Sequence, residues 1–357
     1  MRLLSLRVRQ VRNLTALDLQ PASHLNILTG PNAAGKTSVL EAVHILGRAR
    51  SFRARRLEDV VQWGAEQASI AGEVARPEGG SLWLGVGYER GRPALRIGGE
   101  DVKGASELAE WLPLQVINPD SHRLLEAGPE RRRQYLDWGV FHVEQAFHAI
   151  WRRYRRALRQ RNQALRTGSE ILAPWERELG ETGAAIDRFR QAYLAELGGF
   201  LPEVVTRTLG SLRVSLTYDR GWPAGRPLAE VLEDARGRDS ELGFTRSGPH
   251  RADLGIRING VPAQHTVSRG QQKALAASLL LAQAALYTSR SGRPCLFLVD
   301  DLPAELDVRH REALLAMLRD LDTQVFVTAL EPGTLAPEGW GEVKRFHVEQ
   351  GTVIEMV

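Results

Sequence analysis

A glycine-rich segment near the N-terminus has the residue types and spacing that bind a chain of phosphates. Residues 30–37 read G-P-N-A-A-G-K-T and fit the pattern G-x-x-x-x-G-K-[ST]. In such a loop, backbone N–H groups surround the phosphates, the lysine contacts the β- and γ-oxygens, and the hydroxyl group binds Mg²⁺. We therefore predict a nucleotide site in which Lys36 is also catalytic and Thr37 is a magnesium ligand. Its residues are Gly30, Pro31, Asn32, Ala33, Ala34, Gly35, Lys36, Thr37 and Ser38.

Two adjacent acids follow an apolar segment in the C-terminal third of the chain. Residues 296–299 read L-F-L-V and precede Asp300 and Asp301. P-loop enzymes present a magnesium-binding carboxylate at the end of such a strand. We predict that Asp300 contacts Mg²⁺ and that Asp301 is catalytic, polarising the attacking water. A strand that ends in acids often only meets solvent, but the phosphate loop earlier in the chain favours the catalytic interpretation.

A second anion site is predicted about 30 residues before these acids. Residues 267–273 read V-S-R-G-Q-Q-K and open an amphipathic segment. A serine hydroxyl and glycine N–H groups at a helix N-terminus can bind an anion. The same serine could simply cap the helix, but the order of the three motifs favours the anion site. Its residues are Ser268, Arg269, Gly270 and Gln271.

Arginines gather in two places along the chain. One group directly follows the helix expected after Lys36, and clustered arginines bind nucleic-acid phosphates without reading sequence. We predict DNA contact there, by Arg48, Arg50, Arg53, Arg55 and Arg56. The second group, within residues 152–159, lies opposite an apolar helical stripe, where a solvated face is the more ordinary interpretation.

Strands and helices that would position these residues can be read from the apolar pattern. Residues 25–28 form an apolar strand before the phosphate loop, and apolar residues at helical spacing follow Lys36 until Gly47. Short strands are expected at 81–88 and 94–97, with a hairpin turn at Gly98-Gly99. Strand and helix also alternate after residue 267, which is typical of a buried parallel sheet.

The middle of the chain has helical periodicity. Helices are expected from Gly128 onward, and two long apolar stripes, at 147–165 and 175–197, are separated by Gly168 and Pro174. We predict that they pair as an antiparallel hairpin. Residues 120–240 would then be a helical insertion between two parts of a head, at 1–119 and 241–357.

Composition narrows the class of protein. The 357 residues, with 43% hydrophobic and 25% charged side chains, are typical of a globular chain, and the net charge of +4 permits nucleic-acid binding without requiring it. The single cysteine, Cys295, fits a reducing compartment. Arginines interrupt the N-terminal leucines, and the apolar stretch 274–286 is shorter than the roughly 20 residues that span a bilayer. We expect a cytoplasmic protein without a membrane segment.

The three motifs, in this order, resemble those of the ABC-ATPase superfamily, and the whole chain resembles its RecF family. Four further fragments carry this resemblance, at 51–53 (S-F-R), 128–133 (G-P-E-R-R-R), 247–251 (S-G-P-H-R) and 304–307 (A-E-L-D). The resemblance implies an α/β fold, namely a P-loop ABC-type ATPase head with a mixed sheet and two lobes, into which a mainly helical arm is inserted. It also implies ATP and Mg²⁺ as cofactors and a weak, DNA-stimulated ATPase.

The resemblance further implies an ATP-dependent homodimer, in which the Ser268 to Gln271 segment completes the site of the other subunit. DNA at gaps or single-strand/double-strand junctions, recombinase loading, mediator proteins of the RecF pathway, and links to replication and the SOS response are implied as well. Asp301 replaces the usual glutamate, so hydrolysis should be slow. Asp307 and Thr328 are implied switch residues, and Gln115 is a further candidate magnesium ligand.

Other members of the superfamily are alternatives. A transporter ATPase subunit is disfavoured by the absent switch histidine and by the span of about 230 residues from Lys36 to the serine motif. A head with a coiled coil of hundreds of residues would need a longer insertion. A fused nuclease domain would need more residues after the last predicted strand.

Overall fold

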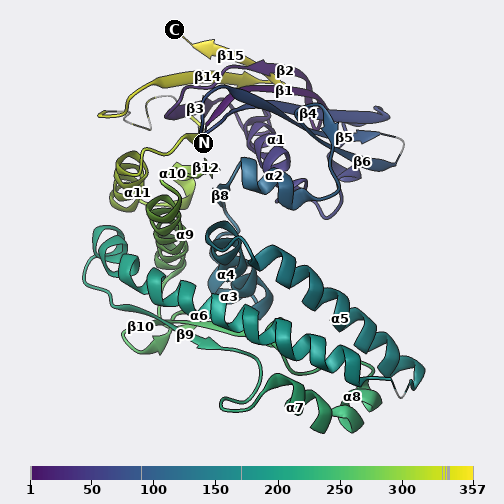
Figure 1. Ribbon diagram of the computed structural model, residues 1–357. Coiled ribbons are helices and arrows are strands. Elements are labelled where there is room, and N and C mark those ends of the chain that lie inside the picture. The colour runs from purple at the N-terminus through teal and green to yellow at the C-terminus, as the bar shows by residue number, and fades with distance from the viewer. Residues whose placement is uncertain are drawn as a thin grey trace. The chain divides into compact units, whose positions relative to one another are not determined.

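The computed structural model describes residues 2–89, 91–169, 171–331, 333, 335 and 338–356. Figure 1 shows the ribbon, in which the chain divides into two compact units. Unit 1 comprises Met1–Ser121 and Ala277–Val357, and unit 2 comprises His122–Ala276. The two ends of the chain therefore fold together, and the middle of the chain forms a separate unit.

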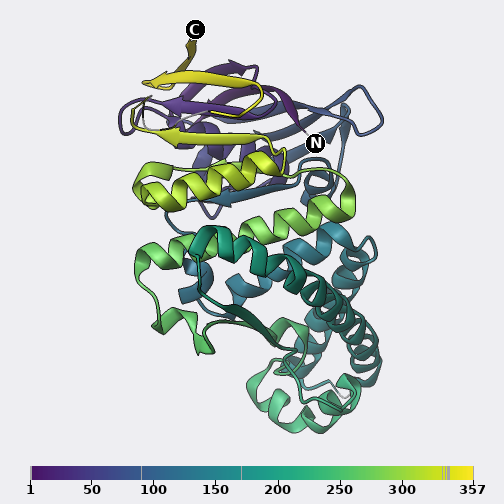
Figure 2. The ribbon, with the colours of Figure 1, turned by 90° about the vertical axis from the view of Figure 1, so that its left-hand side faces the viewer.

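A six-stranded, mostly parallel sheet forms the centre of unit 1. Its central strands are apolar because they are buried on both faces. Only β15 runs antiparallel to its neighbour. In order across the sheet, the strands are β15 (Thr352–Met356), β14 (Val343–Glu349), β3 (Leu25–Thr29), β13 (Val325–Ala329), β12 (Leu296–Val299) and β8 (Leu114–Ile117). Figure 2 shows the C-terminal strands, in yellow, beside the purple N-terminal strands.

The order of these strands explains how distant motifs meet. β3 leads into the phosphate loop and β12 leads into the two acids, and β13 pairs in parallel with both. Because the three strands point the same way, the segments that follow β3 and β12 lie at one edge of the sheet. Thr328, near the end of β13, lies between them.

A second, antiparallel sheet completes unit 1. Its strands are, in order, β2 (Leu14–Leu19), β1 (Leu3–Val11), β4 (Gln67–Ala75), β5 (Ser81–Glu89), β6 (Arg92–Ile97) and β7 (Glu100–Asp101). Along β1, Leu3, Leu6 and Val8 are buried, whereas Leu4 is 42% exposed. A β-bulge shifts the register between Leu3 and Ser5, which interrupts the alternation of buried and exposed residues along this strand.

Helix α1 (Lys36–Arg48) packs between the two sheets, and it contacts β1, β4 and β5 as well as β12 and β13. Its apolar side chains belong to one hydrophobic core with residues of both sheets. In Figure 1, α1 and α2 (Ala105–Trp111) lie on one face of the antiparallel sheet. The alternating burial along β4 shows that the other face of this sheet meets solvent.

Unit 2 is mainly helical. Two long helices, α5 (Phe147–Thr167) and α6 (Ala173–Leu209), pack against each other as the predicted hairpin. Around them lie α3 (Arg123–Glu126), α4 (Pro129–Val143), α7 (Leu228–Asp234), α8 (Arg236–Leu242) and a small sheet of β9 (Val214–Asp219), β10 (Asp253–Ile258) and β11 (Val261–Pro262). Searched over the described residues, no helix is long and apolar enough to cross a membrane.

The limits of the compact units differ from the predicted limits at 119 and 240. The second change of unit comes at Ala276, so residues 241–276, expected in the head, lie in unit 2. The reason is that β10 pairs with β9, which precedes it by more than thirty residues. Helix α9 (Arg269–Ser291) begins in unit 2 and ends in unit 1.

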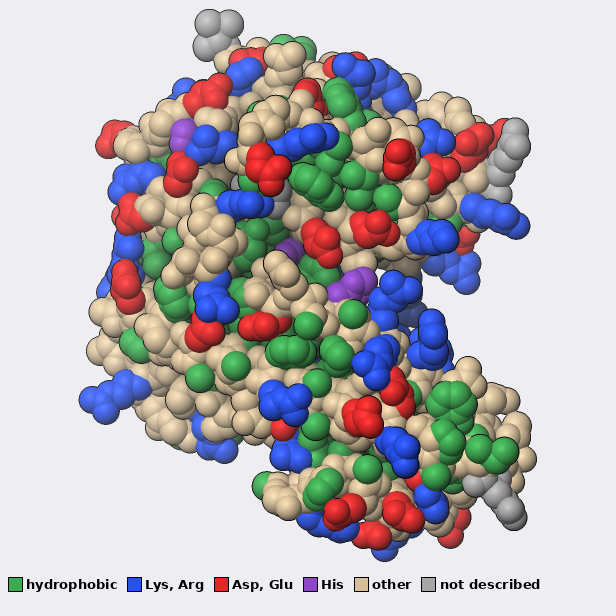
Figure 3. Space-filling view, viewed as in Figure 1, with side chains coloured by type: hydrophobic (Ala, Val, Ile, Leu, Met, Phe, Trp, Pro, Cys, Tyr) green, Lys and Arg blue, Asp and Glu red, His purple; other side chains and the backbone are tan. Residues whose placement is uncertain are grey.

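Charged side chains of both signs are interspersed over the face that Figure 3 shows. A net charge of +4 is thus spread over many arginines and acids, and the distribution of individual groups carries more information than the total.

Candidate nucleotide site

The phosphate loop connects β3 to α1, and two of its glycines cannot be replaced without strain. Gly30 has φ +147°, and a Cβ atom there would lie 2.1 Å from the carbonyl oxygen of Val348. Gly35 has φ +119°, and its Cβ atom would lie 2.9 Å from the side chain of Asn13. Within the loop, Lys36 Nζ donates to the carbonyl oxygens of Gly30 at 2.6 Å and Pro31 at 2.8 Å. The lysine therefore lies across the loop, where phosphates would be held.

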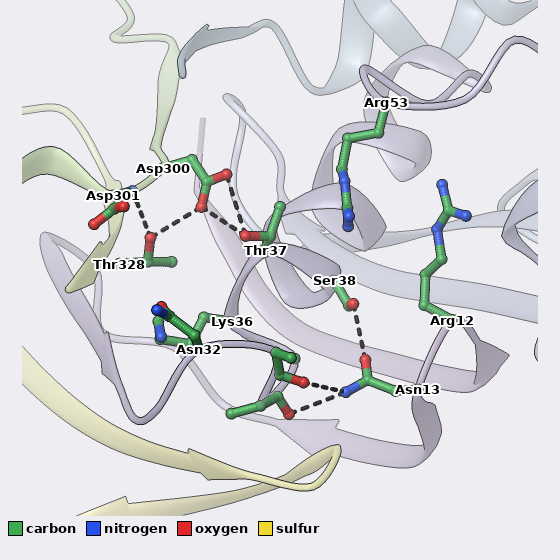
Figure 4. Close-up of a pocket in the computed structure, with 13 residues that line it drawn as sticks. Arg12, Asn13, Asn32, Lys36, Thr37, Ser38, Arg53, Asp300, Asp301 and Thr328 are labelled. Carbon is green, nitrogen blue, oxygen red and sulfur yellow. Dashed lines mark hydrogen bonds between the residues drawn. The ribbon is translucent and has the colours of Figure 1, made fainter. Parts of the chain in front are cut away.

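Thr37 and Asp300 meet although they are 263 residues apart. Thr37 Oγ1 donates to Asp300 Oδ1 at 2.9 Å and lies 3.2 Å from Oδ2. Thr328 Oγ1 donates to the same carboxylate at 3.0 Å and accepts from the Asp301 backbone N–H at 2.7 Å. Figure 4 shows this chain of contacts. Burial raises the pKa of Asp300, while the bonds from Thr37 and Thr328 oppose this shift.

The Thr37 hydroxyl and the Asp300 carboxylate fit Mg²⁺, which prefers oxygen ligands and is commonly held by one carboxylate together with phosphates. The burial of Asp300 supports this fit, because a buried carboxylate gains most from a nearby cation. Partial burial lowers the pKa of Lys36, while the charges of Asp301 and Asp300 act in the opposite direction. The site therefore combines a cation for phosphate oxygens with oxygen ligands for a metal ion.

These residues line a pocket of about 460 Å³, which is of the size that small-molecule sites have. In Figure 4, Arg12 and Arg53 lie across the pocket from Asp301 and Thr328. The pocket thus has two arginines on one side, and Lys36 lies with Asp301 and Thr328 on the other. The lining residues are Arg12, Asn13, Asn32, Ala33, Ala34, Gly35, Lys36, Thr37, Ser38, Arg53, Asp300, Asp301 and Thr328.

Arg12, Asn13 and Glu41 are parts of this site that the sequence analysis missed. Asn13 Nδ2 donates to the Ala34 carbonyl oxygen at 3.0 Å, and Asn13 Oδ1 accepts from Ser38 Oγ at 2.9 Å. Arg12 binds the fully buried Glu41 through Nε at 2.9 Å and Nη2 at 2.7 Å. Arg12 and Asn13 do not belong to a phosphate-loop pattern. They lie in the β1–β2 turn and contact the loop and α1.

The segment predicted as a second anion site lies in unit 2, at the start of α9. Ser268 Oγ accepts from the backbone N–H of Gln271 at 3.4 Å, so the serine caps the helix. Ser268, Arg269, Gly270 and Gln271 are all exposed. A Cβ atom on Gly270 would meet no atom within 4 Å, so the backbone there is open to a ligand.

Two other predicted residues lie away from the pocket lining. Gln115 is 4% exposed, and its Nε2 donates to Gln283 Oε1 at 3.1 Å on α9. Its side-chain amide is thus engaged inside unit 1. Asp307 caps α11 (Val308–Asp320) by accepting from the His310 backbone N–H at 2.9 Å, which lowers the pKa of the Asp307 carboxyl group.

The arginine group after α1 is divided by the structure. Arg48 is partly buried and donates to the Leu114 carbonyl oxygen at 2.7 Å, and burial together with Arg50 lowers the pKa of Arg48 to about 9. Arg53 faces the nucleotide pocket, 3.5 Å from Glu41. Arg50, Arg55 and Arg56 are exposed, and Arg56 pairs with Glu58 at 2.6 Å.

Comparisons with known proteins agree with this geometry. Residues 2–352 match the model of the RecF/RecN/SMC N terminal domain family. A curated relative from Stutzerimonas stutzeri (strain A1501), named DNA replication and repair protein RecF, is 46% identical over 363 residues, covering 100% of this chain and 98% of the relative. The chain belongs to the RecF family. A relative of the same name from Pseudomonas entomophila (strain L48) is 47% identical, covering 99% of this chain and 98% of the relative.

Solved structures give the same fold. A RecF structure, described as the recombination mediator protein RecF-ATP in the RecFOR pathway, has a TM-score of 0.90 at 24% identity, covering 100% of this chain and 98% of that one. An Smc head bound to the C-winged helix domain of ScpA has a TM-score of 0.62 at 14% identity, covering 100% of this chain and 98% of that one. The predicted fold class, an ABC-type ATPase head with a helical arm, is therefore confirmed.

Proposed function

We propose that this chain is an ATP-dependent DNA-binding protein of recombinational DNA repair, which forms a homodimer in its ATP state and hydrolyses ATP slowly. The observation that carries the proposal is the pocket in which Lys36, Thr37, Asp300 and Thr328 meet below the phosphate loop. RecF relatives that are 46–47% identical over nearly the whole chain support its place in DNA repair and replication.

In this proposal, Lys36 and the loop N–H groups hold the phosphates of ATP, and Thr37 and Asp300 hold Mg²⁺. The ion supplies positive charge to the phosphate oxygens. Asp301 orients the attacking water, because its side chain lines the pocket next to Asp300. Thr328 links the two acids through its hydroxyl group, so it can report a change at one acid to the other. Gln115 stays a candidate magnesium ligand through its Oε1, because its Nε2 is the atom that donates to Gln283.

The Ser268 to Gln271 segment is proposed to bind the γ-phosphate in the site of a second copy. The support is its exposed helix N-terminus, where Gly270 leaves the backbone open. Asp307 and Thr328 are proposed as switch residues. ATP favours the dimer because a ligand shifts an association equilibrium by its differential interaction with the two states. ADP lacks the bridging phosphate and should leave the protein monomeric.

The proposed partners are DNA at gaps or single-strand/double-strand junctions and the mediator proteins of the RecF pathway. Recombinase loading, a link to the SOS response and a cytoplasmic location belong to the same proposal. Among the arginines after α1, Arg50, Arg53, Arg55 and Arg56 are all exposed, and Arg50, Arg55 and Arg56 lie outside the nucleotide pocket lining. Arg53 instead faces the nucleotide pocket, so its contribution to DNA binding would be coupled to ATP.

Light scattering with ATP, ADP or no nucleotide tests the dimer, beside calorimetric titration of ATP. We expect Ser268→Arg to bind ATP through its own phosphate loop but to remain monomeric, because the new side chain fills the second anion site. Lys36→Met is the matched control. It should lose ATP binding and therefore also remain monomeric, with an unchanged unfolding midpoint.

Each result has a distinct meaning. A Ser268→Arg protein that dimerises with ATP as the parent does would reduce the serine segment to a helix cap. Unchanged ATP affinity in Lys36→Met would refute the nucleotide site itself.

A further inference from the structure

The solvent-facing side of the antiparallel sheet in unit 1 contains a trough. Its floor consists of small residues on three adjacent strands, β4, β5 and β6, and its volume is about 390 Å³. Arg9 borders it on the β1 side and Arg96 on the β6 side. The floor residues are Ser69, Ala71, Gly85, Gly87 and Ala94. Exposed strands usually carry larger side chains, so this floor needs an explanation.

The glycines of the floor are not required by the fold. A Cβ atom on Gly85 would lie 3.5 Å from Arg96 Cβ, and one on Gly87 would come no closer than 3.8 Å to any atom, which are ordinary contacts. By contrast, Gly72 on the buried face is required, since its Cβ atom would lie 2.3 Å from Leu46 Cδ2 of α1. Glycine inside a strand costs stability and often marks the close approach of a ligand.

The strand register places Arg7 and Arg96 on opposite sides of the floor. Each arginine contacts an outer acid: Arg7 Nε lies 3.9 Å from Asp18, and Arg96 Nε lies 2.9 Å from Asp101. The backbones of the two arginines are separated by three strand spacings, or about 14 Å. One cross-strand row reads, in order, Asp18, Arg7, Ala71, Gly85, Arg96 and Asp101.

Both arginines have donors to offer. Their side chains are 60% and 63% exposed, and both ion pairs use Nε. The hydrogen bonds of the described residues leave the terminal amino groups of Arg7 and Arg96 without a protein acceptor. The acids of this row lie beyond the arginines, and the carboxylate in the trough lining, Glu89, lies at the end of β5 and outside the row, so the gap between the arginines favours an anion. The planar guanidinium fork matches a phosphate group.

Two aromatic residues line the trough: Tyr88, which is half-buried and donates its Oη to Glu58 at 3.1 Å, and Trp83, over whose ring Arg7 lies at 4.7 Å. A protein that binds unpaired bases needs free aromatic faces for stacking. Because Arg7 covers this ring, the trough favours a sugar–phosphate strand whose bases are already paired.

We infer that the trough seats one sugar–phosphate strand of duplex DNA, with the backbone lying over Gly85 and Gly87 and its phosphates contacted by Arg7 and Arg96. This inference rests on the proposed DNA-binding function. It adds a duplex contact that is separate from the arginines after α1. Contacts to the backbone alone would make binding independent of sequence and sensitive to salt.

The test titrates fluorescent duplex DNA and single-stranded DNA of the same length with the full-length protein and ATP. The variant Gly85→Val/Gly87→Val fills the trough, while β-branched residues suit an exposed strand. We expect an unfolding midpoint no lower than that of the parent and a several-fold loss of duplex affinity. Ala16→Val, on the exposed side of β2 and outside the trough lining, is the matched control and should bind as the parent does.

A second pair of variants does not depend on the glycines. Arg96→Ala should lower the slope of log affinity against log salt by up to about one unit, the effect of one lost phosphate contact. Arg92→Ala, an exposed arginine on the same strand outside the trough lining, should leave the slope unchanged.

The outcomes separate the two ideas. Parent protein that binds neither DNA would refute the proposed function. Parent that binds duplex DNA, with both the glycine variant and Arg96→Ala behaving like it, would refute the trough alone. Loss confined to single-stranded DNA would overturn the assignment to a duplex.

Discussion

The nucleotide pocket of unit 1 and a buried ion-pair network in unit 2 both hold charged side chains, but they are completed in different ways. In unit 2, Arg161 is fully buried, and it donates to Glu176, Asp239, Thr245 and the Leu232 carbonyl oxygen at 2.7–3.3 Å. These contacts use all five N–H donors of a guanidinium group. The donors of Arg161 are therefore all used within the fold, whereas the buried Asp239 Oδ1 has no hydrogen-bond partner among the described residues.

In unit 1, the charged groups face an opening. Lys36, Arg53 and Asp301 all line the pocket, and Lys36 contacts only backbone carbonyl oxygens there, within the described residues. Carbonyl oxygens can accept the hydrogen bonds of an ammonium group, but they do not neutralise its charge. The comparison teaches that a closed network stabilises the fold, whereas an open one is poised for a ligand of complementary charge. Substitutions should therefore affect stability in one region and binding in the other.

The largest effect is expected at Arg161. Arg161→Met removes one partner of a buried network and leaves the carboxylates of Glu176 and Asp239 in the interior. Such a loss destabilises a protein by about 3–5 kcal/mol. Denaturant unfolding measures the change.

Arg153→Met is the matched control, because Arg153 lies on the same helix and pairs with Glu178 at 2.8 Å on the surface. An exposed pair of this kind contributes little to stability. Equal effects of the two substitutions would show that the network in unit 2 is not what holds α5 in place.

Sequence patterns predicted the elements that are held by local signals. The phosphate loop, α1 and the strand before the acids follow from glycine positions and apolar spacing between residues 25 and 47 and at 296–299. The Arg161 network could not be predicted in this way. Its members come from four helices and a loop, and in the sequence Arg161 is one of several arginines on a helix that resembles a solvated face.

The second prediction concerns the pH dependence of stability, through His250 in unit 2. His250 Nδ1 accepts from Tyr154 Oη at 2.6 Å, and Nε2 donates to the Thr245 carbonyl oxygen at 3.0 Å, so the neutral ring is held. Burial, followed by nearby arginines, lowers the pKa of His250 to about 4. The unfolded chain therefore binds more protons than the folded protein between the ordinary histidine pKa and pH 4. Stability should therefore decrease as the pH is lowered from the ordinary histidine pKa to pH 4, by about 1.4 kcal/mol per pH unit, or about 3 kcal/mol in all.

Denaturant unfolding of the parent and of His250→Gln between pH 4 and pH 7 measures this dependence. His44 in unit 1, whose pKa burial lowers to about 3, titrates in both proteins and cancels in the difference. We expect the variant to lose less stability on acidification than the parent does. Identical pH profiles would mean that His250 accepts a proton in the folded state without cost.

In the candidate site, the sequence predicted the residues whose type a ligand-binding motif specifies. It missed the residues that hold the phosphate loop in place. Lys36, Thr37 and Asp300 have roles that a pattern specifies. Asn13 contacts the loop from 21 residues away, and in the sequence it is an ordinary turn residue. Glu41 was also missed, because it lies on a helix whose apolar stripe drew the interpretation toward packing.

The smallest expected effect sharpens the comparison, because it concerns a residue that serves both purposes. Asn13 closes the loop as an internal contact does, donating to Ala34 O and accepting from Ser38 Oγ, yet it lines the pocket. Asn13→Ala removes both bonds, each worth about 1 kcal/mol. Stability should fall by about 2 kcal/mol, and ATP affinity should fall a few-fold because the loop is less well formed before binding. Asn13→Asp keeps the acceptor for Ser38 but places a carboxylate against the Ala34 carbonyl oxygen. Asn13→Asp should weaken ATP binding more than Asn13→Ala does, since its negative charge also repels the phosphates. Calorimetric titration beside unfolding decides the matter: if both variants lose stability while ATP affinity is unchanged, Asn13 is only a structural contact, and the loop is held in its binding conformation by Gly30 and Gly35 alone.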